Sequence, residues 1–140
     1  GTVLFFIIIS YNHVMFKKIK WFFQRGSRGW ADCDWWNMHS YVSDMMPELI
    51  RKLKNGHGCP SEFYDKGVKN DECHKWYEIL EEMAQGFEAA KFLDTCGYHK
   101  WVDADKGKML EIDTEAMENA RKKMERGLDL FSKHYLNLWD

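Results

Sequence analysis

Two cysteine–histidine pairs are the residues whose types and spacing come nearest to a metal site. Cys73 and His74 are adjacent, and Cys96 stands three residues before His99. Zinc prefers four such ligands in tetrahedral array, and structural sites draw on pairs about two to four residues apart. Only Cys96 and His99 have this spacing. Cys73 and His74 are adjacent, and adjacent residues of a helix point in different directions. We expect no bound metal and no other cofactor, with buried thiols and surface imidazoles as the simpler interpretation.

The same four residues support the alternative of a small metal- or thiol-dependent enzyme. Nucleophilic catalysis needs a cysteine or serine, a base and an orienting group that converge in space. The chain has no GxSxG, P-loop or GxGxxG motif. Its carboxylates are not isolated on an apolar face, so paired acid–base catalysis is unsupported. We therefore expect a protein that is not an enzyme.

The segment RGWADCDWWNMHSY, residues 28–41, and the arginine shortly before it form a candidate binding surface. Tryptophan and arginine are the residues most enriched at the centres of protein interfaces. A structural interpretation competes with binding: Asp34 caps a helix, Trp30 packs against its first turn, and the arginines are solvated. The candidate binding residues are Arg25, Arg28, Trp30, Asp32 and Asp34.

Nucleic-acid binding is a weaker alternative. Residues 16–30, FKKIKWFFQRGSRGW, interleave cations with aromatic rings, which could contact phosphates and bases. An amphipathic helix followed by a loop explains the same pattern. The formal net charge is −2, whereas domains that bind nucleic acid are usually strongly basic. A protein partner is therefore favoured.

The spacing of apolar residues predicts an all-α protein, a small bundle of three long helices preceded by one short helix. The short helix covers Phe16–Gln24 and ends at the glycines of RGSRG. Before it, the apolar run Val3–Ile9 predicts a short strand. This run is too short to span a membrane, and we expect no membrane contact. The alternative is that Met15 is the natural start, with residues 1–14 a non-native extension and residues 15–140 a single helical domain.

The first long helix carries two adjacent apolar rows, which predict a wide buried stripe. It starts at Asp32 or Asp34 and ends at Gly56, with a kink or a fresh start at Pro47. The first row is Trp35, Met38, Val42, Met45 and Leu49, and the second is Trp36, His39, Ser43, Met46, Ile50 and Leu53.

Two more long helices follow, capped by Asn70 or Asp71 and starting near Asp113 or Thr114 respectively. Residues 94–108 between them are predicted to be a loop. A glycine inside each helix costs about 1 kcal/mol relative to alanine, so Gly86 and Gly127 predict a close helix crossing. The apolar rows are Trp76, Ile79, Leu80, Met83, Phe87 and Ala90, then Met117, Ala120, Met124, Gly127, Phe131, Tyr135 and Leu138. Three side chains in register with these stripes are predicted to lie in the core: Trp35, Trp76 and Phe131.

The cysteine content bears on the compartment. The four cysteines are Cys33, Cys59, Cys73 and Cys96, and an even number would allow two disulfides. A chain of 140 residues can bury a core without such crosslinks. We therefore expect reduced thiols in a cytoplasmic protein.

Three separated blocks of this pattern resemble a family of small uncharacterised proteins encoded by bacteriophages and prophages. The resemblance covers about residues 16–140 and leaves residues 1–14 outside. It implies a phage or metagenomic origin, the cytoplasm of an infected host cell, and a host or phage protein as partner, but no activity. We expect an accessory protein that acts by binding, or alternatively a minor structural or assembly protein of the phage. The matching residues are Arg28, Gly29, Trp30, Asp32, Asp34, Trp35, Gly58, Pro60, Trp76, Ile79, Leu80, Gly86, Phe87, Glu88, Gly127, Leu128, Leu130, Phe131, Tyr135, Leu138 and Trp139.

Overall fold

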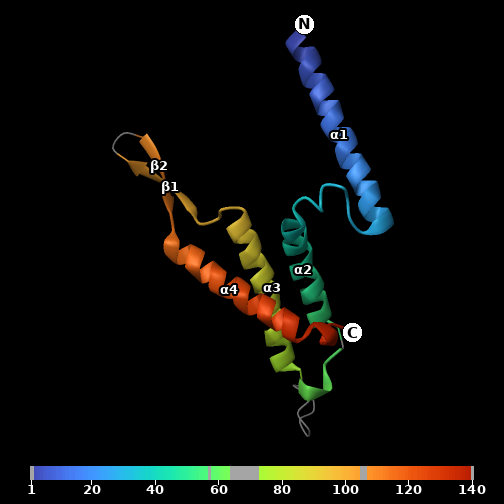
Figure 1. The fold of residues 1–140 in the computed structure, drawn as a ribbon, viewed down its shortest axis with the longest axis vertical. Helices are drawn as coiled ribbons and strands as arrows, with labels where there is room; N and C mark the ends of the chain where they lie inside the picture. Colours follow the sequence, from blue (N-terminus) through green and yellow to red (C-terminus); the bar gives the residue numbers. More distant parts are fainter. Residues whose placement is uncertain (1, 57, 64–72, 105–106, 140) are drawn as a thin grey trace. The chain divides into compact units, whose positions relative to one another are not determined.

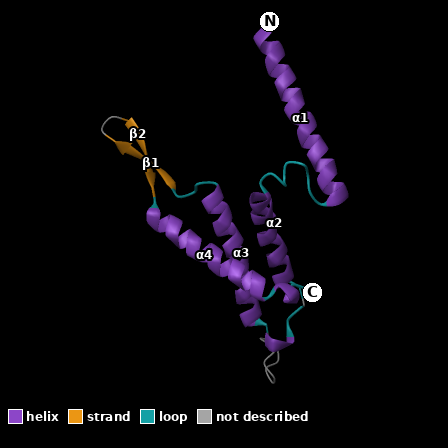
Figure 2. Cartoon of the chain, in the orientation of Figure 1, coloured by secondary structure: helices purple, strands orange, loops and turns teal. Residues whose placement is uncertain are grey.

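The chain is mainly helical, which confirms the coarse part of the predicted fold class. The computed structural model describes residues 2–56, 58–63, 73–104 and 107–139. Contacts group the chain into two units, Gly1–Tyr41 and Val42–Asp140, and each is described by itself. The elements are α1 (Thr2–Arg28), α2 (Met38–Lys54), η1 (Ser61–Phe63), α3 (His74–Asp94), β1 (His99–Ala104), β2 (Gly107–Ile112), α4 (Thr114–Lys133) and η2 (Tyr135–Asn137) (Figures 1 and 2).

Helix α1 contains the predicted short helix, Phe16–Gln24, but extends it in both directions and replaces the predicted strand over Val3–Ile9. A short run of apolar residues fits either a strand or a helix, so the sequence pattern did not decide between them. Gly26 stays inside α1, because one interior glycine costs only about 1 kcal/mol. The helix ends where Gly29 adopts a φ of +81° and its N–H donates to the Arg25 carbonyl at 3.0 Å. Within the described part of the chain, no helix is long and apolar enough to cross a membrane.

Helix α2 begins later than predicted, at Met38 instead of Asp32 or Asp34. The preceding residues form turns, so Trp35 and Trp36 lie outside the helix and are 61% and 66% exposed. The prediction that Trp35 is a core residue is therefore wrong. Pro47 is buried inside α2, which continues through it to Lys54. The second predicted row supplies two of the three buried positions of this helix, Ser43 and Ile50, whereas most of the first row is exposed.

The core of the second unit centres on α3. Trp76, Leu80 and Met83 are its largest fully buried side chains, and this confirms the prediction for Trp76. Leu130 of α4 joins the same cluster. Phe131 is half-buried beside this cluster, with its ring edge-on to Phe87 at a centroid distance of 5.3 Å.

Helices α3 and α4 cross at their two glycines, as the sequence predicted (Figure 1). A Cβ atom added to Gly86 would lie 2.5 Å from the Cα atom of Gly127, and the reverse distance is the same. Real Cβ atoms do not approach backbone this closely. Glycine at both positions is therefore what allows the two backbones to meet.

Replacing Gly86 with alanine is expected to lower the free energy of unfolding by about 1 to 3 kcal/mol. Alanine favours a helix by about 1 kcal/mol over glycine, but here its methyl group would force the backbones of α3 and α4 apart. Gly26→Ala is the matched control, because a Cβ there meets nothing within 4 Å, and it should be neutral or stabilising. Denaturant unfolding measures both. An unchanged midpoint for Gly86→Ala would contradict the close crossing.

A two-stranded antiparallel sheet occupies much of the segment predicted as a loop (Figure 2). Strands β1 and β2 pair with Trp101 opposite Leu110, and this hairpin is the part of the fold that the all-α prediction lacks. Helix α4 then starts as predicted, because the Asp113 carboxylate accepts a hydrogen bond from the Ala116 N–H at 2.9 Å. This is the standard N-cap arrangement.

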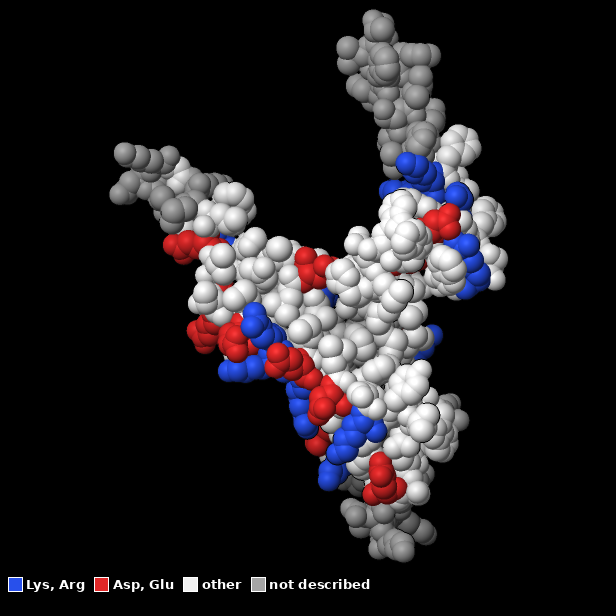
Figure 3. Space-filling view, viewed as in Figure 1, with Lys and Arg blue, Asp and Glu red and all other residues white. Residues whose placement is uncertain are grey.

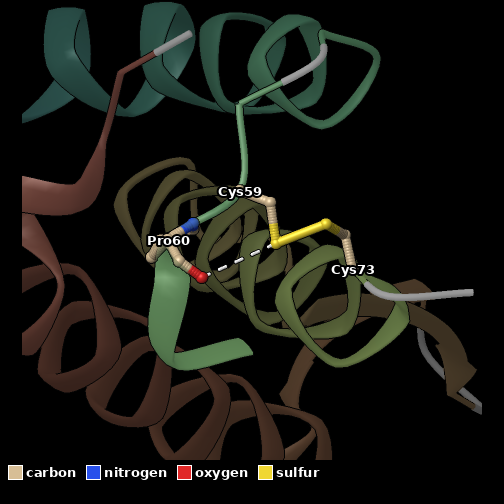
Figure 4. The surroundings of a disulfide bond; sticks show 3 residues. All are labelled: Cys59, Pro60 and Cys73. Atoms are coloured by element: carbon tan, nitrogen blue, oxygen red, sulfur yellow. Dashed lines mark hydrogen bonds between the residues drawn. A yellow bond between two sulfur atoms is a disulfide. The ribbon is translucent and has the colours of Figure 1, made fainter. Parts of the chain in front are cut away.

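A disulfide joins Cys59 to Cys73 across a sequence separation of 14 residues, with their Cα atoms 6.0 Å apart. Figure 4 shows this bond, with the Cys59 sulfur 3.8 Å from the Pro60 carbonyl oxygen. The expectation of reduced thiols is therefore wrong for this pair, while Cys33 and Cys96 are free. Cys73 also occupies the N-cap position of α3 without a side-chain cap bond. The predicted caps, residues 70 and 71, lie outside the described residues.

Candidate functional site

The structure separates the four residues considered for metal binding or thiol chemistry. Cys73 and His74 stand at the start of α3, and Cys96 and His99 follow its end. A helix of 21 residues is about 30 Å long, which is far beyond any shared coordination sphere. The Cys73 sulfur is also bonded to Cys59. The structure therefore does not bring these four residues together into one site, and the described residues contain no group of three or more side chains that could hold a metal ion.

The five predicted binding residues do come together, in the first unit. They belong to the end of α1 and to the segment 29–37, which we name the tryptophan turn. Asp34 is the anchor of this turn, since only 7% of it is exposed. Its carboxylate accepts hydrogen bonds from Arg25 Nε at 2.9 Å and Arg25 Nη2 at 2.5 Å. It also accepts one from the Ala31 N–H at 2.7 Å, so it closes the turn instead of capping α2.

Asp32 makes the second set of contacts between the turn and α1. Its carboxylate accepts hydrogen bonds from Lys20 Nζ at 2.9 Å and Gln24 Nε2 at 2.8 Å, and one from Arg28. Its N–H donates to Gln24 Oε1 at 3.0 Å. The two acidic residues therefore fix the turn against α1 along about two helical turns, and neither is available to a partner as an isolated charge.

These contacts shift the acidity of both carboxyl groups. The hydrogen bonds from Arg25 lower the pKa of Asp34 to about 2, against the opposing effect of burial. The pKa of Asp32 is held well below its usual range by hydrogen bonds from Gln24, Lys20 and Arg28. Asp34 in turn raises the pKa of the Arg25 guanidinium. Both carboxylates are therefore ionised at neutral pH, and neither can serve as a proton donor there.

Arg28 and Tyr41 complete the turn. The Arg28 guanidinium lies over the Trp30 ring, with its carbon 3.8 Å from the ring centroid, and Arg28 Nε donates to the Trp30 carbonyl at 3.0 Å. The Tyr41 hydroxyl donates to the Gly29 carbonyl at 2.6 Å. Arg25 and Arg28 therefore bind groups of the turn, whereas the structural interpretation expected them to be solvated. Trp30 stacks on Arg28, whereas the same interpretation expected it to pack against the first turn of the next helix.

Tryptophan is what the turn leaves exposed. Trp30, Trp35 and Trp36 are 44%, 61% and 66% exposed. The Trp35 and Trp36 rings lie edge-to-face, with centroids 5.9 Å apart. The sequence pattern did not predict that Trp35 and Trp36 are surface residues, because both have the spacing of the apolar rows of α2 and stand one helical turn before its first residues. The start of α2 at Met38 removes them from that face and makes them surface residues.

The Arg25–Asp34 pair gives the first unit a pH dependence. Because the folded state has the lower Asp34 pKa, the unfolded state binds the proton more readily. The stabilisation is therefore full above about pH 4 and is lost as the pH falls through about 2. We expect Asp34→Asn to be less stable than the parent by about 1 to 2 kcal/mol at pH 7, with a gap that closes near pH 2. Unfolding followed at both pH values measures this, and an equal gap at the two would contradict it.

A groove beside the second unit's core is the other place where titratable groups gather. It has a volume of about 450 Å³ and is lined by α3, α4 and η1, with Glu62 and the buried His134 at one end. His134 Nδ1 is 3.7 Å from Glu62 Oε1, and its ring packs against both Phe63 and Trp76, which stack on each other. None of the described residues that line the groove is a serine or a cysteine, and acidic and basic side chains are mixed along it. Figure 3 shows the same mixture of charges along α4. This arrangement favours a solvated surface over a catalytic centre.

Comparison of the chain with models of protein families, with curated proteins and with solved structures finds no match. The resemblance to phage proteins therefore remains a prediction from the residues that carry it.

Proposed function

We propose that the protein is not an enzyme and that it acts by binding another protein through the tryptophan turn. One observation carries this proposal: three tryptophans within seven residues are exposed on a turn that is fixed by buried and charged contacts. Tryptophan side chains supply large contact areas and dominate the energetics of many interfaces. A turn that is already ordered loses little conformational entropy when a partner binds.

The charges of the turn support a protein partner over a nucleic acid. Lys20, Arg25 and Arg28 all pair with Asp32 or Asp34. Proteins bind nucleic acids largely through contacts between free cations and phosphates, and cations that are neutralised in this way contribute little to such contacts. The exposed surface that remains is aromatic, and it suits an apolar pocket on another protein.

We extend the proposal to origin and compartment. The residues shared with phage and prophage proteins suggest a phage-encoded accessory protein, whose partner is a host or phage protein in the cytoplasm of the infected cell. The Cys59–Cys73 disulfide bears on the compartment, because such bonds persist in oxidising environments and are rare in the cytoplasm. Thiol labelling of the protein in cells tests this part: an intact disulfide there would contradict the cytoplasmic proposal and leave the binding proposal standing.

Affinity capture with mass spectrometry tests the binding proposal. The tagged chain is compared with the variant Trp35→Ala/Trp36→Ala and with the control Trp101→Ala, which removes a tryptophan that is 70% exposed in the other unit. We expect a protein that is captured by the parent and the control and lost with the double variant. Circular dichroism verifies that all three chains are folded. If the double variant captures the same proteins as the parent, the tryptophan turn is not the interface.

A further inference from the structure

The side of α1 that faces away from the tryptophan turn exposes a row of large apolar side chains. Phe16, Phe22 and Phe23 are 72%, 73% and 69% exposed, and Met15 and Ile19 are each 48% exposed. These positions recur at intervals of three and four residues, so they share one face of the helix. We name this set the aromatic face. Contiguous exposed apolar surface of this kind marks an interaction site.

The opposite side of α1 contacts the tryptophan turn. Gln24, Arg25 and Arg28 direct their side chains to Asp32, Asp34 and the Trp30 carbonyl of the tryptophan turn. The aromatic face takes no part in those contacts. An occupant of the aromatic face therefore leaves the turn intact, and this inference stands apart from the proposed protein-binding function.

Positive charge borders the aromatic face. Helix α1 contains five lysines and arginines and neither aspartate nor glutamate. Lys18 stands four residues before Phe22, so it is a helical neighbour of the exposed rings. Lys17 and Lys18 take no part in the contacts with Asp32 and Asp34, whereas Lys20 is paired with Asp32. Figure 3 shows blue cations beside white side chains on this unit. Aromatic and aliphatic side chains with lysine at their margins are the pattern of helices that lie in the surface of a bilayer.

We propose that the aromatic face of α1 docks on an anionic lipid surface, with the phenylalanines at the level of the upper acyl chains and the lysines at the phosphates. Charge complementarity selects this occupant. A second copy of the face would bring lysines close to lysines, which is unfavourable. A nucleic acid would meet Met15 and Ile19, which offer no aromatic plane for a base. The proposal replaces the expectation of no membrane contact, and it needs no membrane-spanning helix.

Co-sedimentation of the full chain with vesicles tests this proposal. One vesicle set is a mixture of phosphatidylglycerol and phosphatidylcholine, and the other is phosphatidylcholine alone. We expect binding to the anionic vesicles that is at least tenfold tighter than binding to the neutral ones and that weakens as salt is added. Equal binding to both sets, or none to either, would overturn the proposal.

Two variants and one control locate the site. Phe22→Ser/Phe23→Ser removes apolar surface, and Lys17→Gln/Lys18→Gln removes charge; each is expected to weaken binding to anionic vesicles about tenfold or more. Leu136→Ser, at an exposed residue of η2 in the other unit, is expected to bind like the parent. Binding unchanged in both double variants would overturn the assignment. So would a concentration-dependent dimer in sedimentation equilibrium that Phe22→Ser/Phe23→Ser abolishes, or preferential binding of the chain to a single-stranded oligonucleotide.

Discussion

Replacing Trp76 with alanine is expected to lower the free energy of unfolding by about 3 to 5 kcal/mol. The side chain is fully buried in the core cluster, and its ring stacks on Phe63 and meets the His134 ring edge-on. Alanine would leave a cavity among Leu80, Met83 and these rings, in addition to losing the burial of the indole. Denaturant unfolding of the full chain measures the effect.

The variant Trp76→Phe refines this test. The buried Trp76 Nε1 has no hydrogen-bond partner among the described residues, and an unpaired buried donor is itself costly. Phenylalanine removes that donor and keeps much of the aromatic packing, so its cost should be well below that of alanine. Trp101→Ala, at an exposed tryptophan, should change stability by no more than about 0.5 kcal/mol. Similar stabilities for Trp76→Ala and Trp101→Ala would contradict the core described above.

Removing the disulfide is expected to lower the free energy of unfolding by about 3 kcal/mol, in the variant Cys59→Ala/Cys73→Ala. The bond closes a loop across a separation of 14 residues, and a loop of this length restricts the unfolded chain by about that amount. The loss of the bond should loosen the packing around Trp76, because Cys59 lies in the same buried cluster. Thermal unfolding measures it.

Dithiothreitol separates the crosslink from the loss of the two sulfur atoms. The parent chain should become less stable when it is reduced, whereas the double variant should not respond. Cys96→Ser is the matched control, because Cys96 is an exposed free thiol, and it should keep the full response to reduction. A parent chain that unfolds at the same temperature with and without reductant would mean that the disulfide contributes nothing.

The core and the helix crossing could be predicted because local and long-range requirements agree there. Trp76 lies in a regular apolar stripe, and Gly86 and Gly127 have no local reason to stand inside helices, so a close backbone approach was the remaining explanation. The N-cap role of Asp113 could likewise be predicted, because Asp113 stands directly before a segment with helical apolar spacing. In each case the residue type at that position fits one structural role, which is core packing, close helix crossing or N-capping, and the structure confirms that role.

The start of α2 could not be predicted because Asp34 has two competing uses. A carboxylate before an apolar stripe predicts a cap, but here Arg25 and the Ala31 N–H take its oxygens. Arg25 and Asp34 are nine residues apart and meet across a turn, and the spacing of apolar residues along a helix cannot predict such a contact. The misplacement of Trp35 follows directly, since a helix that begins four residues later turns a predicted core residue into a surface one.

The helical conformation of Val3–Ile9, the hairpin and the disulfide were missed for different reasons. Val3–Ile9 is too short and too uniformly apolar to distinguish strand from helix. The hairpin depends on the pairing of two short runs, His99–Ala104 with Gly107–Ile112, and neither run is long enough to predict a strand by itself. Four cysteines allow three pairings, and their spacing does not select one.

The most direct test of the account is the affinity of the tryptophan turn for the captured partner, measured by titration calorimetry. Trp35→Ala/Trp36→Ala is expected to weaken binding by about 2 kcal/mol or more, which is roughly thirtyfold in Kd. Trp101→Ala should leave Kd within about a factor of two. Equal affinities for the parent and the double variant, with both chains folded, would contradict the claim that the exposed tryptophans of this turn are the binding surface.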